Sequence, residues 1–202
     1  MTGTVFTEIY PAPAWNRREI LRYASCGGGD ERTLSLMEEC LEEIEPQLSY
    51  RVCFARFPVK RECDGIDLGF ARVRSRGLAK NLDACDEIVL FAATVGLAPD
   101  RLTARFAGVS PAKALFFDAI GAERIEALCD AFCASLREKE AERGGFTRPR
   151  FSPGYGDLPL GLQREIFRAL LPERHIGAAL RESLIVSPAK TVTAIVGIGK
   201  NK

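Results

Sequence analysis

The strongest constraint on the fold is a continuous apolar run over residues 86–95, which reads DEIVLFAATV and is ended by Gly96. The run is rich in β-branched residues and short, so it predicts a central strand that is buried on both faces. Residues 49–59 alternate instead, with Tyr50, Val52 and Phe54 facing one way and the residues between them facing the other. That alternation predicts a half-buried strand. A second short strand is predicted around residues 66–70.

Helix signals occupy much of the remaining chain. Asp30 and Ser75 are candidate N-caps, and Ser110 followed by Pro111 is typical of a helix start. Gly121 is a candidate break within the longest helical pattern. The predicted helices cover 14–24, 31–48, 75–82, a segment from Asp100, 111–142, 160–171 and 175–181.

The chain closes with two apolar segments, ESLIV at 182–186 and TVTAIVGI at 191–198. They predict two strands joined by a hairpin turn over 187–190. Strands and helices do not alternate regularly, so the pattern favours an α+β fold over a doubly wound α/β fold. We expect an N-terminal helical segment over 1–48 and an α+β domain over 49–202, with one domain over 1–202 as the alternative.

Composition bounds the classes of partner. The chain has 202 residues and a formal net charge of +1. It therefore lacks the excess of basic residues that is typical of nucleic-acid-binding proteins. Its first residues lack a basic start followed by an apolar run, and no segment approaches the roughly 18 apolar residues that cross a membrane. We therefore expect a cytoplasmic protein with neither a nucleic-acid nor a membrane partner.

Most catalytic and metal-binding patterns are missing from the sequence. Its seven cysteines form no CxxC motif, and Cys129 and Cys133 are interpreted as core residues because zinc needs about four ligands. For His175, the only histidine, a packing or surface role is favoured over catalysis. The glycine run 27–29 follows a helix, which favours a linker over a phosphate-binding loop. The acidic pairs at 38–39 and 42–43 are interpreted as a solvated helix face.

One loop has the composition of a ligand-binding segment. Residues 144–161 are rich in glycine and proline and are too long for a simple connection. Within them, Gly154 and Gly156 flank Tyr155 and permit a positive φ or a close backbone approach to a small molecule. Arg150 offers a rigid guanidinium for a carboxylate, and Pro153 stiffens the loop. From the residues alone, a structural turn remains the alternative to a ligand site.

Three segments, in order, resemble the activation domain of cobalamin-dependent methionine synthase. Residues 150–159, RFSPGYGDLP, resemble its RxxPGYxxxP signature. Residues 90–102 are similar to its FAATLG…DRL strand and helix start, and residues 182–193 to its ESFAMWPGASVSG segment. Together the three matches span over half the chain. The resemblance implies a C-shaped α+β fold with a twisted antiparallel sheet and flanking helices.

The same resemblance implies a function and a set of ligand contacts. The family domain binds S-adenosylmethionine and closes over a cobalamin domain, which it returns to the methylated state with an electron from a flavodoxin-type donor. Arg150 matches the arginine expected to pair with the ligand carboxylate, and Pro153, Gly154, Tyr155 and Gly156 match the loop that lines the site. Asp130 lies where the family has a helical glutamate, with an exposed helix carboxylate as the alternative.

The sequence also departs from the family pattern. Ile195 and Val196 stand where the family has aromatic residues, so we expect that ligand contact to be lost. No cobalamin, homocysteine or folate domain is recognisable, so the cobalamin is expected on a partner, a corrinoid-binding methionine synthase or related methyltransferase.

We expect an accessory component of that methyltransferase, with S-adenosylmethionine as methyl donor, and not a self-sufficient enzyme. The alternative is a non-catalytic module of the same fold that docks on a corrinoid protein. A different role, using Cys26 beside the glycine run, also remains open.

Overall fold

The computed structural model describes residues 4–201, and its centre is a five-stranded antiparallel sheet. β6 is the middle strand, with Phe91 opposite both Phe54 on one neighbour and Ala194 on the other. The prediction of a buried central strand is therefore confirmed. In spatial order the strands are β1 (Phe6–Ile9), β2 (Arg51–Pro58), β6 (Glu87–Thr94), β10 (Thr191–Lys200) and β7 (Gly145–Thr147).

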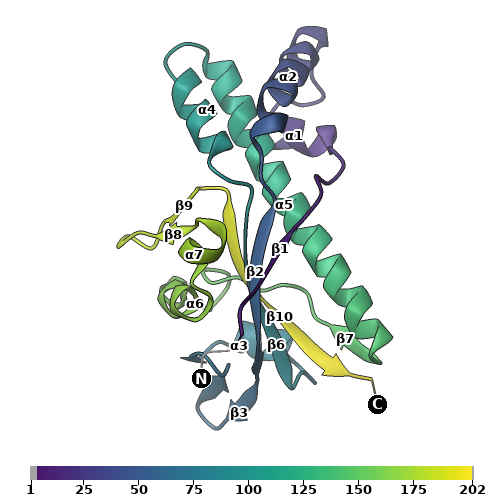
Figure 1. The fold of residues 1–202 in the computed structure, drawn as a ribbon, viewed down its shortest axis with the longest axis vertical. Coiled ribbons are helices and arrows are strands. Elements are labelled where there is room, and N and C mark those ends of the chain that lie inside the picture. Colours follow the sequence, from purple (N-terminus) through teal and green to yellow (C-terminus); the bar gives the residue numbers. More distant parts are fainter. Residues whose placement is uncertain (1–3, 202) are drawn as a thin grey trace.

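Helices cover both faces of this sheet (Figure 1). The helix α5 (Pro111–Glu142) covers one face, where Phe132 packs among Val52 and Phe91. The other face is covered by α3 (Arg76–Asn81), α6 (Gln163–Leu170) and α7 (Pro172–Ile176). The prediction that β2 is half-buried is wrong, because its second set of side chains, including Ala55, is buried under these shorter helices.

A third core lies beyond the sheet, where α1 (Arg17–Tyr23), α2 (Glu31–Ile44) and α4 (Ala98–Phe106) gather around the first half of α5 (Figure 1). The predicted break at Gly121 is wrong, because α5 runs through it without interruption. A Cβ atom at Gly121 would lie 2.6 Å from Pro99 Cβ, so the glycine allows α4 to pack closely against α5. Asp30 and Ser75 cap α2 and α3 as predicted, and α5 starts at Pro111.

The N-terminal residues are joined to the rest of the chain by both strand pairing and helix packing. β1 pairs with β2, and α1 and α2 pack on α5. The choice between a segment over 1–48 with a domain over 49–202 and one domain over 1–202 stays a prediction.

The predicted C-terminal hairpin is wrong. β9 (Val186–Ser187) pairs with β8 (Ala179–Leu180), whereas β10 pairs with β6 and β7. The intervening segment 187–190 is held on the helices instead, since Asp100 accepts a hydrogen bond from the Ala189 N–H and Lys190 pairs with Asp118.

The remaining elements are short. Pro172 starts α7 instead of only ending the preceding helix, which agrees with the preference of proline for a first helical position. Of the residues predicted as a second strand, only Ile66 and Asp67 are in one, and they belong to a small separate sheet. That sheet contains β3 (Lys60–Glu62), β4 (Gly65–Asp67) and β5 (Arg72–Val73), and two 3-10 turns cover Glu45–Gln47 and Leu160–Leu162.

Candidate functional site

The loop singled out by its sequence is built on the edge of β10. After β7 the chain continues along this strand, where the Arg148 N–H donates to the Gly197 carbonyl at 2.8 Å. Phe151 and Ile195 then exchange both backbone hydrogen bonds, at 2.8 and 2.9 Å. The chain leaves the strand at Ser152, so Arg150 is carried on a rigid edge and the following residues form a turn.

Two glycines shape that turn. Gly154 has a φ of 88° and Gly156 a φ of 54°, a region that side-chain-bearing residues rarely adopt. The Gly154 N–H donates to the Leu158 carbonyl at 2.9 Å, and the Leu158 N–H donates to the Tyr155 carbonyl at 3.0 Å. Leu158 and Pro153 are buried, whereas the Tyr155 side chain is exposed. The loop is therefore an ordered turn that presents an aromatic ring.

A pocket of about 360 Å³ opens between this loop, α5, α6 and β10. Its volume is within the range of sites for small organic ligands, about 300 to 1,000 Å³. The lining mixes charged, hydroxyl-bearing and aromatic side chains: Glu126, Arg150, Phe151, Ser152, Pro153, Tyr155, Gln163, Thr191, Val192 and Thr193.

Arg150 is the central charged group of the pocket. Its Nη2 donates to Glu126 Oε2 at 2.5 Å and lies 3.4 Å from Asp130 Oδ1. Its Nη1 is buried and has no hydrogen-bond partner among residues 4–201. A buried guanidinium nitrogen without an acceptor is costly, and a carboxylate in the pocket would satisfy it.

The helical acidic residue that lines the pocket is Glu126, which the sequence reading missed. Asp130, the predicted residue, lies one turn later at the rim, with 76% of its side chain exposed. Both lie on the same face of α5, because residues four apart on a helix are neighbours. The four-residue spacing back from Asp130 is the one sequence signal that could have identified this position. Either carboxylate can hold a ligand ammonium group.

The pocket also contains an open strand edge. Ile195 uses its backbone N–H and C=O toward the loop, so those of Thr193, two residues earlier, point to the same side. The loop has already left the strand there, which leaves these groups facing the pocket. Beside them the Thr193 hydroxyl donates to Gln163 Oε1 at 2.9 Å. This edge provides both donors and acceptors for a polar ring or a hydroxyl group.

Ile195 and Val196, where an aromatic contact was expected to be lost, do not line the pocket. Both are core residues, with Ile195 in the cluster beneath α6 and Val196 in the cluster beneath α5. The rings at the pocket come instead from Phe151 and Tyr155.

The two cysteines of α5 lie near Arg150 without forming a reactive site. Burial raises the pKa of both thiols, Cys129 more strongly than Cys133, and the Arg150 charge only partly offsets it. They are therefore neutral thiols at pH 7. Within residues 4–201, no group of three or more His, Cys, Asp or Glu side chains is arranged to hold a metal ion.

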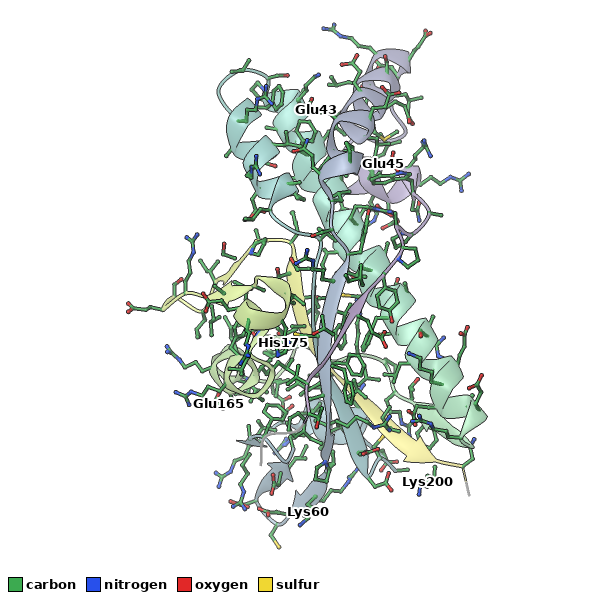
Figure 2. All side chains as sticks on the ribbon, in the orientation of Figure 1. Glu43, Glu45, Lys60, Glu165, His175 and Lys200 are labelled. Atoms are coloured by element: carbon green, nitrogen blue, oxygen red, sulfur yellow. The ribbon has the colours of Figure 1, made fainter. Side chains whose placement is uncertain are left out.

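The other residues considered from the sequence lie away from the pocket. Cys26 is partly buried in the turn after α1, against the helical core. His175 lies on α7 (Figure 2). Its Nδ1 is 3.2 Å from Thr7 Oγ1. On α2, Glu39 and Glu43 form ion pairs with Lys113 and Arg105 of neighbouring helices. No helix in the described part of the chain is long and apolar enough to span a membrane.

Comparison with known proteins links this architecture to one solved structure. No family model matches the sequence, and no curated protein matches it either. The chain is similar in structure to the crystal structure of the MetH reactivation domain bound to AdoHcy, with a TM-score of 0.68 and 20% sequence identity. The match covers 96% of this chain and 78% of that one. The α+β fold expected from the three sequence segments is thereby confirmed: the chain folds as the MetH reactivation domain does.

Proposed function

We propose that this protein binds S-adenosylmethionine in the Arg150 pocket and serves a separate corrinoid methyltransferase, such as a cobalamin-dependent methionine synthase, during its reactivation. The single observation that carries the proposal is the buried, unpartnered Nη1 of Arg150 at the wall of an open pocket. The fold supports the same ligand class, since the similar MetH domain was solved with AdoHcy bound.

The pocket residues match the chemical groups of this ligand. Arg150 would pair with the carboxylate, and Glu126 at the pocket wall, or Asp130 at its rim, with the ammonium. The open edge at Thr193 and the Tyr155 ring would contact the nucleoside through hydrogen bonds and stacking. Pro153, Gly154 and Gly156 would maintain the loop backbone in the conformation that admits the ligand.

The chain's own residues would orient the methyl donor, not carry out the transfer. S-adenosylmethionine supplies a methyl group on a sulfonium, and a reduced corrinoid on the partner accepts it. The protein would hold the donor at fixed ends and exclude water when docked. We also propose that the electron comes from a flavodoxin-type donor and that the protein works in the cytoplasm. The proposed partner is a cobalamin-dependent methionine synthase or a related corrinoid methyltransferase.

Calorimetry with S-adenosylhomocysteine and S-adenosylmethionine tests the proposal. We expect binding by the wild type and a loss of roughly 10- to 100-fold in affinity for Arg150→Ala, because a charged hydrogen bond contributes about 1.5–3 kcal/mol. Arg72→Ala is a matched control, since Arg72 forms only an exposed ion pair with Glu62 on the small sheet.

The absence of binding at millimolar ligand, both alone and with a corrinoid partner, would contradict ligand binding. Retained reactivation of the partner in that case would favour the alternative, a module that docks on the corrinoid protein without S-adenosylmethionine.

A further inference from the structure

The helix α3 contacts the Arg150–Leu158 loop through Asp157, a loop residue that does not line the Arg150 pocket. Asp157 Oδ1 accepts hydrogen bonds from the Ser75 hydroxyl at 2.5 Å and from the Gly77 N–H at 3.1 Å. Its Oδ2 accepts from the Arg76 N–H at 2.6 Å. One loop carboxylate therefore satisfies two of the free N–H groups at the start of α3, and these bonds hold the distal end of the turn.

The other end of the loop is attached to the same helix. Asn81, the last residue of α3, donates from Nδ2 to the Pro149 carbonyl at 3.0 Å. Arg148, just before it, donates to the Asp83 carbonyl at 2.8 Å. The loop residues that line the pocket all lie between the two attachments, whereas no residue of α3 lines it.

The contact surface is closely fitted at Gly77. A Cβ atom added there would lie 3.0 Å from Asp157 Oδ1 and 3.2 Å from Phe151 Cζ. The glycine thus lets the first turn of α3 pack closely against the loop.

A loop with two glycines needs such external attachment. Gly154 and Gly156 have more conformational freedom to lose than other residues, so ordering this turn carries a large entropy cost. If the unbound loop were mobile, ligand binding would have to supply that cost. The Asp157 contacts are made entirely within the chain, so they can hold the turn in place independently of a ligand. The hydrogen bonds from Ser75 and from the Arg76 N–H hold the pKa of Asp157 below its ordinary value, which keeps the carboxylate charged at neutral pH.

We propose that Asp157 is a positioning residue, which anchors the Arg150–Leu158 loop to α3 and preorganises it for its ligand without touching that ligand. The ligand-dependent part of this inference rests on the proposed function, whereas the anchoring of the loop does not.

Ligand affinity gives the first test. We expect Asp157→Ala to weaken binding of S-adenosylhomocysteine about tenfold, as the loss of a helix cap would, with Asp157→Asn in between because it retains an acceptor for Ser75. The matched control is Asp30→Ala, which removes an N-cap aspartate of α2 whose Oδ1 accepts from the Thr33 N–H at 2.8 Å. Wild-type affinity in Asp157→Ala would overturn the proposal.

Amide hydrogen exchange without ligand gives the second test and separates the two proposals. We expect the N–H groups of Gly154 and Leu158 to exchange about tenfold faster in Asp157→Ala, with the amides of β6 and α5 unchanged. Asn81→Ala, which removes only the Pro149 attachment, should give a smaller change of the same kind.

If the wild type binds no S-adenosylhomocysteine while exchange accelerates as expected, the proposed function fails and the anchoring stands. Unchanged exchange in Asp157→Ala overturns the anchoring whatever the ligand result.

Discussion

Two arginine–carboxylate pairs lie close together along α5, and they differ in how completely the arginine is hydrogen-bonded. Arg124 is fully buried, and its Nε and Nη2 each donate to Glu123 at 2.5 Å. Its Nη1 donates to the Pro13 carbonyl at 2.6 Å, and its Nη2 also donates to the Ala14 carbonyl at 2.9 Å. The Trp15 ring covers its flat face, with the centroid 4.0 Å from Cζ.

Arg150 has the opposite pattern. Its side chain is 26% exposed, Nη2 alone contacts Glu126 and Asp130, and Nη1 is buried with no partner in the described chain. A buried guanidinium with a partner on each of its three nitrogens, such as Arg124, serves the fold, here by attaching residues 13–16 to α5. A charge left with a free donor at a pocket is available to a ligand.

Removing Arg124 should have the largest effect on stability. Arg124→Met leaves the Glu123 carboxylate buried and unpaired, so we expect a loss of roughly 3–5 kcal/mol in the free energy of unfolding by urea denaturation. The double variant Glu123→Leu with Arg124→Met should recover most of that loss, because it removes the unpaired charge. A single variant as stable as the wild type would remove the distinction between the two arginines.

Exchanging the carboxylates near Arg150 tests which of them serves the ligand. We expect Glu126→Gln to weaken S-adenosylhomocysteine binding about tenfold, since it removes a charge at the pocket wall. Asp130→Asn should change affinity less than about threefold, because its side chain is mostly exposed and screened by solvent. The reverse order, measured by calorimetry, would restore Asp130 as the ligand residue.

A third pair on α5 predicts a smaller, pH-dependent effect. Arg56 Nη1 donates to Glu140 Oε1 at 2.7 Å, which holds the pKa of the nearly buried Glu140 below its ordinary value of 4.5. Glu87 and Arg143 also face this pair. Because the folded pKa is lowered, the stabilisation is complete above pH 4.5 and is lost as pH falls through the folded value.

Glu140→Gln should therefore cost about 1 kcal/mol at pH 7, and the difference from the wild type should shrink in acid. Denaturation midpoints between pH 7 and pH 3 measure this. Glu138→Gln, on the exposed side of the same turn, is the control. If the stability difference between Glu140→Gln and the wild type stays constant with pH, the ion pair with Arg56 does not cause it.

The fold was predictable where local chemistry determines the backbone. The apolar run at 86–95 specified a central strand, and the glycines at 154 and 156 specified positive φ angles. The C-terminal hairpin failed because strand pairing depends on distant partners. Segment 182–186 has a strand-like composition, yet residues 187–190 are bonded to α4 and α5.

The site was predictable in part for the same reason. Arg150 and the loop after it form one contiguous segment, so their composition was visible in the sequence. Glu126, Gln163 and Thr193 come from three separate elements. Nothing in the local sequence marks Gln163 or Thr193, and only its four-residue spacing from Asp130 marks Glu126. Gly121 could not be interpreted from the sequence either. Glycine disfavours helices, yet α5 continues through Gly121, because Pro99 packs where a side chain would lie.

The sequence by itself determined the class of fold, the central strand, the helix caps and the glycine-rich turn after Arg150, because each depends on residues near one another in the chain. Only the tertiary structure decided which carboxylate faces Arg150, which arginine is left with a free donor, and that α3 holds the loop. Those outcomes depend on burial and hydrogen bonding between residues that lie far apart in the chain: 24 positions separate Glu126 from Arg150, and 82 separate Ser75 from Asp157.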